Sequence, residues 1–265
     1  MIDLIQHVYI LKLEKNDGQE IENNIKQLFP GKKIYVHEVE GCKKSNRNEG
    51  SINLSFWKIL NHSYVDDIAK DITKNHIDMI RKAFMDNLDF VLFVEEDSRI
   101  ETQKLINEKC KRVNQWMLKR RNKWDIFYLG YCNWPVLFSF LITPDVVRIY
   151  TPLAAHCYIL NRHGMQKILN YTENGNKNME IHIDKMFATI PSFRKYGIFP
   201  MIAFQKNNPA LFTKACDKIN MNISMKSASI VIQYCSIILP ILLILITTLL
   251  FIKLFWKKGI THTAA

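Results

Sequence analysis

Three adjacent acidic residues, Glu95, Glu96 and Asp97, follow directly on the apolar run Phe90–Val94. Apolar residues of this kind predict a strand that is buried on both faces, as in a parallel sheet. Ligands of open α/β sheets bind just beyond the carboxyl ends of such strands. Because strand side chains alternate, we expect Glu95 and Asp97 to share a face, where two carboxylates suit Mg²⁺ or Mn²⁺. A solvated acidic turn is the alternative interpretation.

Two histidines and an aspartate are further candidates for chemistry. His76 lies on the apolar stripe of a helix predicted over Val65–Phe84, where a lone histidine is more often a satisfied core residue than a ligand. His156 begins a predicted strand and could equally serve packing alone. Asp125 opens another predicted strand, and we expect a structural role for it.

A short alternating segment carries a His/Asp pair. Ile181-His182-Ile183-Asp184 alternates strictly, which predicts a strand with His182 and Asp184 on one face. The pair follows a loop rich in glycine and asparagine and is a candidate for a base or a further metal ligand. An exposed strand edge is the alternative.

The elements that would position these residues alternate along the chain. Apolar runs predict strands at His7–Leu13, Lys33–Glu38, Phe90–Val94, Trp124–Gly130 and His156–Leu160. Helical periodicity predicts helices near Gln19–Leu28, Val65–Phe84, Thr102–Lys119 and Gly164–Tyr171. This alternation is typical of a single Rossmann-like α/β domain, which we expect over residues 1–212.

The chain is basic, with a net charge of +11 over 265 residues. Its lysines and arginines are scattered, and the densest cluster, Lys119–Arg121, favours a solvated helix end over a nucleic-acid patch. We therefore expect no nucleic-acid partner. The 6 cysteines form no C-x-x-C pair and no zinc spacing, so they are expected to be reduced and mostly buried.

The carboxyl-terminal region is almost wholly apolar from Ile230 to Phe255. That length satisfies the roughly 20 residues that a bilayer requires, and Trp256 with Lys257 forms an interfacial anchor. We predict a linker over 213–227, a transmembrane helix over 228–256 and a short tail over 257–265. A single late anchor of this kind predicts a tail-anchored protein whose larger domain lies in the cytosol.

Taken in order, several of these features match a known family. The most specific are Leu92–Asp97, against an apolar-Glu-Asp-Asp pattern, and Asp125–Gly130 within a Trp-Asp-x-x-Tyr-Leu-Gly pattern. The strand from His156 and the Asn75-His76 pair follow the same order. Over about residues 5–206 the chain resembles glycosyltransferase family 25, the lipooligosaccharide and collagen galactosyltransferase-like family, which has members in large DNA viruses.

The resemblance implies a GT-A fold and transfer of a hexose, galactose or glucose, from a UDP-sugar donor to a hydroxyl of a glycan or protein acceptor, with inversion. It implies Glu95 and Asp97 as ligands of Mn²⁺ or Mg²⁺ and Asp184 as the catalytic residue. It also implies donor-binding roles for His76, Glu96, His156 and Gln205. With the lipid bilayer as a further partner, the membrane would be that of a host or a virion.

Two departures from the family pattern leave other functions open. Glu96 replaces an aspartate, and Lys12 lies where the family has Asn-Leu followed by a nearby arginine. A catalytically inactive binding module tethered to a membrane is the main alternative. A phosphoryl-transfer or nuclease enzyme would fit the basic charge, but the chain has no G-x-x-x-x-G-K-[ST] loop and no second acidic cluster at the spacing of a two-metal site.

Overall fold

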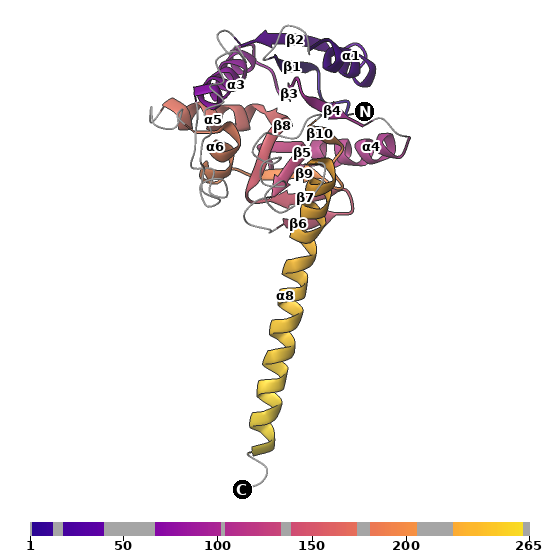
Figure 1. Cartoon of the computed structure of the whole chain (residues 1–265), viewed down its shortest axis with the longest axis vertical. Helices are drawn as coiled ribbons and strands as arrows, with labels where there is room; N and C mark the ends of the chain where they lie inside the picture. The colour runs from indigo at the N-terminus through magenta and orange to yellow at the C-terminus, as the bar shows by residue number, and fades with distance from the viewer. Residues whose placement is uncertain are drawn as a thin grey trace, which may run out of the picture.

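The computed structural model describes residues 2–12, 18–39, 67–101, 104–133, 139–173, 181–205 and 225–261. They form an α/β domain from which one long carboxyl-terminal helix projects (Figure 1). The strands of the main sheet are β1 His7–Lys12, β2 Lys33–Glu38, β3 Phe90–Glu95, β5 Ile126–Asn133, β6 Ser139–Thr143, β7 Val146–Ile149, β8 Pro152–Asn161 and β9 Lys195–Ile198. Two short strands, β4 Ser98–Ile100 and β10 Ala203–Gln205, pair separately. The helices are α1 Gly18–Leu28, α3 Asp67–Met85, α4 Lys104–Lys119, α5 Arg162–Glu173, α6 Ile183–Thr189 and α8 Met225–Thr261.

The main sheet has 8 strands in the order β2-β1-β3-β8-β5-β9-β7-β6. β1 pairs in parallel with β2 and β3, as expected of a Rossmann-like unit with crossover helices. β8 runs antiparallel between β3 and β5. The α/β class is therefore confirmed, and the expectation that β3 lies in a parallel sheet is corrected, because one of its two neighbours is antiparallel.

Two apolar layers form the core, one on each face of the sheet. Alternate residues of β3 divide between them: Leu92 and Val94 pack on the side of α1 and α4, whereas Val91 and Phe93 pack on the side of α3, α5 and α6. All four side chains are fully buried. β3 therefore brings its carboxyl end, and the acidic residues that follow, to the middle of the sheet.

Every predicted strand and helix is present, with its ends shifted by a few residues. The segment Ile181–Asp184 is the exception, because it is not a strand. His182 precedes the first turn of α6, and Asp184 lies within that turn. Ile183, Met186 and Phe187 are buried, and this spacing of three and four is helical, so packing selects a helix over the strand that four alternating residues suggested.

Helix α8 is both a part of the domain and a candidate membrane span over Ser229–Lys253. Its buried residues are spaced along one face, at Ser229, Gln233, Ser236 and Pro240. The residues from 241 to 253 are exposed. Of the predicted linker, residues 213–224 lie outside the described part of the chain, and residues 225–227 already belong to the helix.

Hydrogen bonds tie the first half of α8 to the domain. The side-chain carbonyl of Gln233 accepts from the backbone N–H of Met201 at 3.1 Å. Its amide donates to the carbonyl of Ile198 at 3.4 Å and to the Tyr131 hydroxyl. Gln233 is 1% exposed, so it is a structural residue of the domain and not a polar residue in a lipid-facing span.

Candidate functional site

The acidic tripeptide lies where the sequence predicts it, at the carboxyl end of β3. Glu95 is the last residue of the strand, and Glu96 and Asp97 form the turn that leads into β4. The backbone N–H of Glu96 donates to the carbonyl of Leu11 on β1 at 3.0 Å. Because the strand ends at Glu95, strand alternation does not extend to Asp97, and the turn sets the direction of that side chain.

A buried histidine holds Glu95. His76 comes from α3 and has no exposed surface. Its Nε2 lies 3.1 Å from Oε1 of Glu95, and its Nδ1 lies 2.8 Å from the hydroxyl of Tyr158 on β8. Burial lowers the pKa of His76 to about 3, so the ring is neutral and carries one N–H. If Tyr158 donates to Nδ1, the Nε2–H points at the Glu95 carboxylate and orients it.

The acidic residues disfavour each other's ionisation. Burial raises the pKa of Glu95 to about 8, and the charges of Asp184 and Glu96 add to this effect. Burial also raises the pKa of Asp97 to about 7, with further contributions from Glu95 and Glu96 that a hydrogen bond from Gln205 offsets only in part. Glu95 is therefore within electrostatic range of Glu96 and Asp184, and Asp97 is within range of Glu95 and Glu96.

Asp97 has spare capacity for a ligand. Its Oδ2 accepts from the amide of Gln205, on β10, at 3.4 Å. Its Oδ1 is buried and has no hydrogen-bond partner among the described residues. Across the same residues, neither Glu95 nor Asp97 forms an ion pair with a lysine or arginine. A buried carboxylate oxygen in this state fits a hard cation.

The protein alone does not enclose such a cation. Within the described ranges, no three side chains of histidine, cysteine, aspartate or glutamate converge closely enough to hold a metal ion. Mg²⁺ is commonly bound by one or two carboxylates together with water and substrate phosphates. The donor set is therefore of the kind that a phosphate-bearing substrate would complete.

Asp184 reaches the site from α6. Its Oδ1 accepts from the backbone N–H of Lys185 at 2.7 Å, and the residue is 9% exposed. A hydrogen bond of 2.8 Å from the Thr73 hydroxyl to the carbonyl of Ile181 fastens the preceding loop to α3. The charge of Asp184 also helps raise the pKa of the buried Tyr128 hydroxyl, which places all of these groups in one electrostatic neighbourhood.

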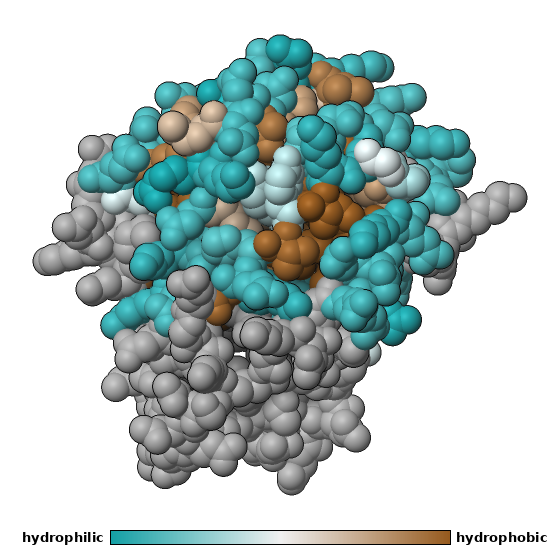
Figure 2. Space-filling view, turned by 90° about the horizontal axis from the view of Figure 1, so that it is seen from above, coloured by the Kyte–Doolittle hydropathy of each residue, from teal (hydrophilic) through white to brown (hydrophobic). Residues whose placement is uncertain are grey.

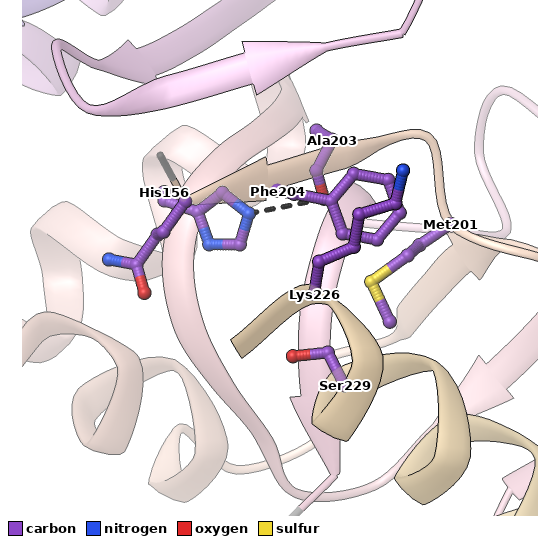
Figure 3. A pocket seen from close by; sticks show the side chains of 7 residues that line it. His156, Met201, Ala203, Phe204, Lys226 and Ser229 are labelled. Carbon is purple, nitrogen blue, oxygen red and sulfur yellow. Dashed lines mark hydrogen bonds between the residues drawn. The ribbon is translucent and has the colours of Figure 1, made fainter. Parts of the chain in front are cut away.

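Gln205, which donates to Asp97, also lines a small pocket between β8, β10 and the start of α8. Figure 3 shows this pocket. His156 lines it from β8, with its Nε2 3.3 Å from the carbonyl of Ala203 on β10. Gly130 makes this approach possible, since a Cβ there would lie 2.3 Å from both the Ala203 oxygen and the His156 Nε2. His156 and Gln205 thus line the same pocket.

Lys226 is a site residue that the sequence analysis did not single out. It lies in the first turn of α8 and lines the same pocket, with Nζ 4.9 Å from the centre of the Phe204 ring (Figure 3). It also forms an ion pair with Glu101. The predicted linker included this residue, and only the docking of α8 on β10 brings it to the pocket.

No protein-family model matches the chain, and no curated protein sequence matches it. Among solved structures, it resembles a UDP-glucose pyrophosphorylase complexed with UDP-glucose at a TM-score of 0.43 and 11% identity, over 82% of this chain and 98% of the other. A glycosyltransferase involved in the glycosylation of the major capsid of PBCV-1 gives a TM-score of 0.42 at 10% identity, over 80% and 98%. A mannose-1-phosphate geranyltransferase from Thermus thermophilus gives 0.40 at 8%, over 73% and 74%. Likeness of this size assigns no function, so the functional assignment depends on the geometry of the site.

Proposed function

We propose that the chain is a membrane-anchored glycosyltransferase of GT-A type. It would move a hexose from a UDP-sugar to a hydroxyl of a glycan or protein, with inversion and with the help of a divalent metal. The observation that carries the proposal is the acidic group at the carboxyl end of β3. The pKa values of Glu95 and Asp97 are raised to about 8 and about 7, and Oδ1 of Asp97 is buried without a hydrogen bond among the described residues.

Among the described residues no lysine or arginine pairs with Glu95 or Asp97, and a donor diphosphate would bring more negative charge. Glu95 and Asp97 would hold Mn²⁺ or Mg²⁺ between them and the diphosphate. When bound, the ion would act as a Lewis acid that stabilises charge on the leaving group. His76 would keep the Glu95 carboxylate in place through its 3.1 Å hydrogen bond. Because the ring has no exposed surface, we assign it this orienting role and not a direct contact with the donor.

The remaining predicted residues would divide between donor and acceptor. Asp184 would take the proton of the acceptor hydroxyl as that oxygen attacks the anomeric carbon and the diphosphate leaves from the opposite face. General base catalysis of this kind typically contributes about 10²–10⁴ in rate. Glu96, His156 and Gln205 would line the donor site, and Gln205 would also position Asp97 through its amide.

The test uses the full-length protein in detergent. UDP should raise the melting temperature in the presence of Mn²⁺ and not in the presence of EDTA, because a ligand that binds only the folded state stabilises it. CMP is the matched nucleotide control. A panel of nucleotide sugars, scored for donor hydrolysis, then identifies the donor.

The outcomes separate the two leading functions. Metal-dependent UDP binding together with hydrolysis of one donor supports the transferase. UDP binding with no hydrolysis of any donor would favour the inactive binding module. The absence of any nucleotide-dependent shift would contradict both.

A further inference from the structure

The last strand of the sheet exposes apolar side chains in succession. Phe140, Leu141 and Ile142 of β6 are 45%, 47% and 43% exposed, and Tyr150, just after β7, is 39% exposed. Phe140 and Tyr150 pack edge to face, with ring centres 6.0 Å apart. We call these four residues the β6 rim. Edge strands of soluble proteins normally carry charges or prolines that discourage association, so an apolar edge indicates a partner surface.

The β6 rim lies where α8 leaves the domain. Figure 1 shows α8 crossing the sheet from β10 past β5 to β6 before it projects away alone, and α8 packs against both β5 and β6. Beyond Pro240, which is buried, the residues of α8 up to 253 are exposed. The opposite end of the domain, around β2 and α1, presents mainly hydrophilic side chains (Figure 2). Of the seven large apolar side chains that are exposed outside α8 in the described part of the chain, four form the β6 rim.

The length of α8 sets the level of a bilayer relative to β6. The exposed and mainly apolar stretch from Ile241 to Ile252 rises only about 18 Å, whereas the hydrocarbon core of a bilayer is about 30 Å thick. A span of about 20 residues that ends at the interfacial Trp256 begins near Ile237. Ile237 is still packed against the domain core. A bilayer that covers the span must therefore reach the part of α8 that is docked on the domain.

We propose that the β6 rim is a membrane-contact edge, which lies in the interfacial region of the same bilayer that α8 spans. Aromatic side chains are favoured at this level because their rings tolerate both apolar and polar surroundings. Arg148 adds a cation, since its guanidinium lies 5.5 Å from the centre of the Tyr150 ring, where it can meet lipid phosphates. The inference depends on α8 as a membrane span and is independent of the proposed transferase chemistry.

The test is site-specific photo-crosslinking of the full-length protein in phosphatidylcholine vesicles, without nucleotide or metal. p-Benzoylphenylalanine replaces Phe140 or, in a second variant, Leu141. Val36 on β2 is the matched negative control, since it is 42% exposed at the hydrophilic end of the domain. Leu245 on α8, 54% exposed, is the positive control for lipid contact. We expect lipid adducts at the two rim positions at least about tenfold above those at position 36.

Each other outcome overturns the proposal in a distinguishable way. Lipid adducts at position 245 with none at the rim would leave the span intact and refute the membrane-contact edge. Adducts at neither place would refute the span as well. Adducts at position 140 to a second copy of the chain, in place of lipid, would make the β6 rim a dimer edge. None of these results bears on nucleotide binding, which is measured separately.

Discussion

The surroundings of Asp125 lower its pKa, whereas those of Glu95 and Asp97 raise theirs. Asp125, at the start of β5, is fully buried and accepts hydrogen bonds from His163 at 2.7 Å, Lys167 at 3.0 Å and the Arg194 guanidinium at 2.7 Å. Burial by itself would raise the pKa of Asp125, but these hydrogen bonds, led by those of Arg194, outweigh it and lower the pKa to about 2. At the end of β3, burial and neighbouring acids raise the pKa values of Glu95 and Asp97 instead.

The difference lies in the source of the positive charge. Asp125 receives its charge from the protein, and the hydrogen bonds fasten α5 and the segment before β9 to the start of β5. Asp97 receives no such charge from any described residue, so it is left with a cost of burial that a bound cation would offset. The hydrogen bonds of Asp125 therefore stabilise the fold, whereas Asp97 has a buried oxygen that could bind a cation.

The largest effect should follow from removing the charge of Asp97. Asp97→Asn keeps the shape of the side chain and should reduce metal-dependent transfer by about 10³-fold or more, because metal stabilisation of a leaving group is worth several kcal/mol. The melting temperature should stay the same or rise, since an uncompensated charge is removed. Initial rates at saturating Mn²⁺, measured beside the melting curve, test both. A variant with the full rate would remove Asp97 from the metal site.

Asp125→Asn should show the opposite pattern. Removing one partner of a buried ion pair costs about 3–5 kcal/mol, and we expect the lower end because Arg194 and Lys167 remain partly exposed. The turnover of the protein that remains folded should be unchanged. Denaturant titration followed by circular dichroism measures the loss, and a variant as stable as wild type would contradict a structural role for Asp125.

Acid should destabilise the protein through Asp125. Its pKa lies below the ordinary value of 3.8, so its contribution to stability is present above about pH 4 and is lost as the pH falls through about 2. The loss is on the order of 2 kcal/mol, since one pKa unit corresponds to about 1.4 kcal/mol. Melting temperatures from pH 5 to pH 2 should fall less steeply for Asp125→Asn than for wild type. Asp97→Asn is the contrasting control: because the pKa of Asp97 is raised to about 7, wild type regains stability from this group as the pH falls towards about 4, so the variant should fall more steeply than wild type.

The sequence could reveal the acidic site more readily than the structural cluster. An apolar run followed by acids is a local pattern, and it correctly located Glu95 and Asp97 at the end of β3. The partners of Asp125 lie 38, 42 and 69 residues away, so no spacing rule could identify them. Lys226 reaches the pocket only because α8 docks on β10, which is equally invisible in the sequence.

The strands and helices, too, could be predicted only where the sequence pattern is local. Strongly patterned segments such as Phe90–Val94 formed the predicted elements, because a continuous apolar run is buried whatever it pairs with. The strands β4, β6, β7, β9 and β10 were missed. Pairing between Val146–Ile149 and Lys195–Ile198 defines β7 and β9 more than local preference does. At Ile181–Asp184 the alternation of only four residues suggested a strand, and contacts with the core favour the helix instead.

The smallest expected effect concerns Gln233, a buried polar residue whose side chain, like that of Asp125, is hydrogen-bonded within the protein. Gln233→Leu keeps the volume of the side chain but leaves the N–H of Met201 and the hydroxyl of Tyr131 without their partner. A buried group left unsatisfied costs about 1–3 kcal/mol, and rearrangement of α8 should keep the loss near the lower value. Val231→Leu, at an exposed position of the same helix, is the control and should leave stability unchanged. If Gln233→Leu lowered transfer without lowering the unfolding midpoint in detergent, helix α8 would belong with the acidic site and not with the structural cluster.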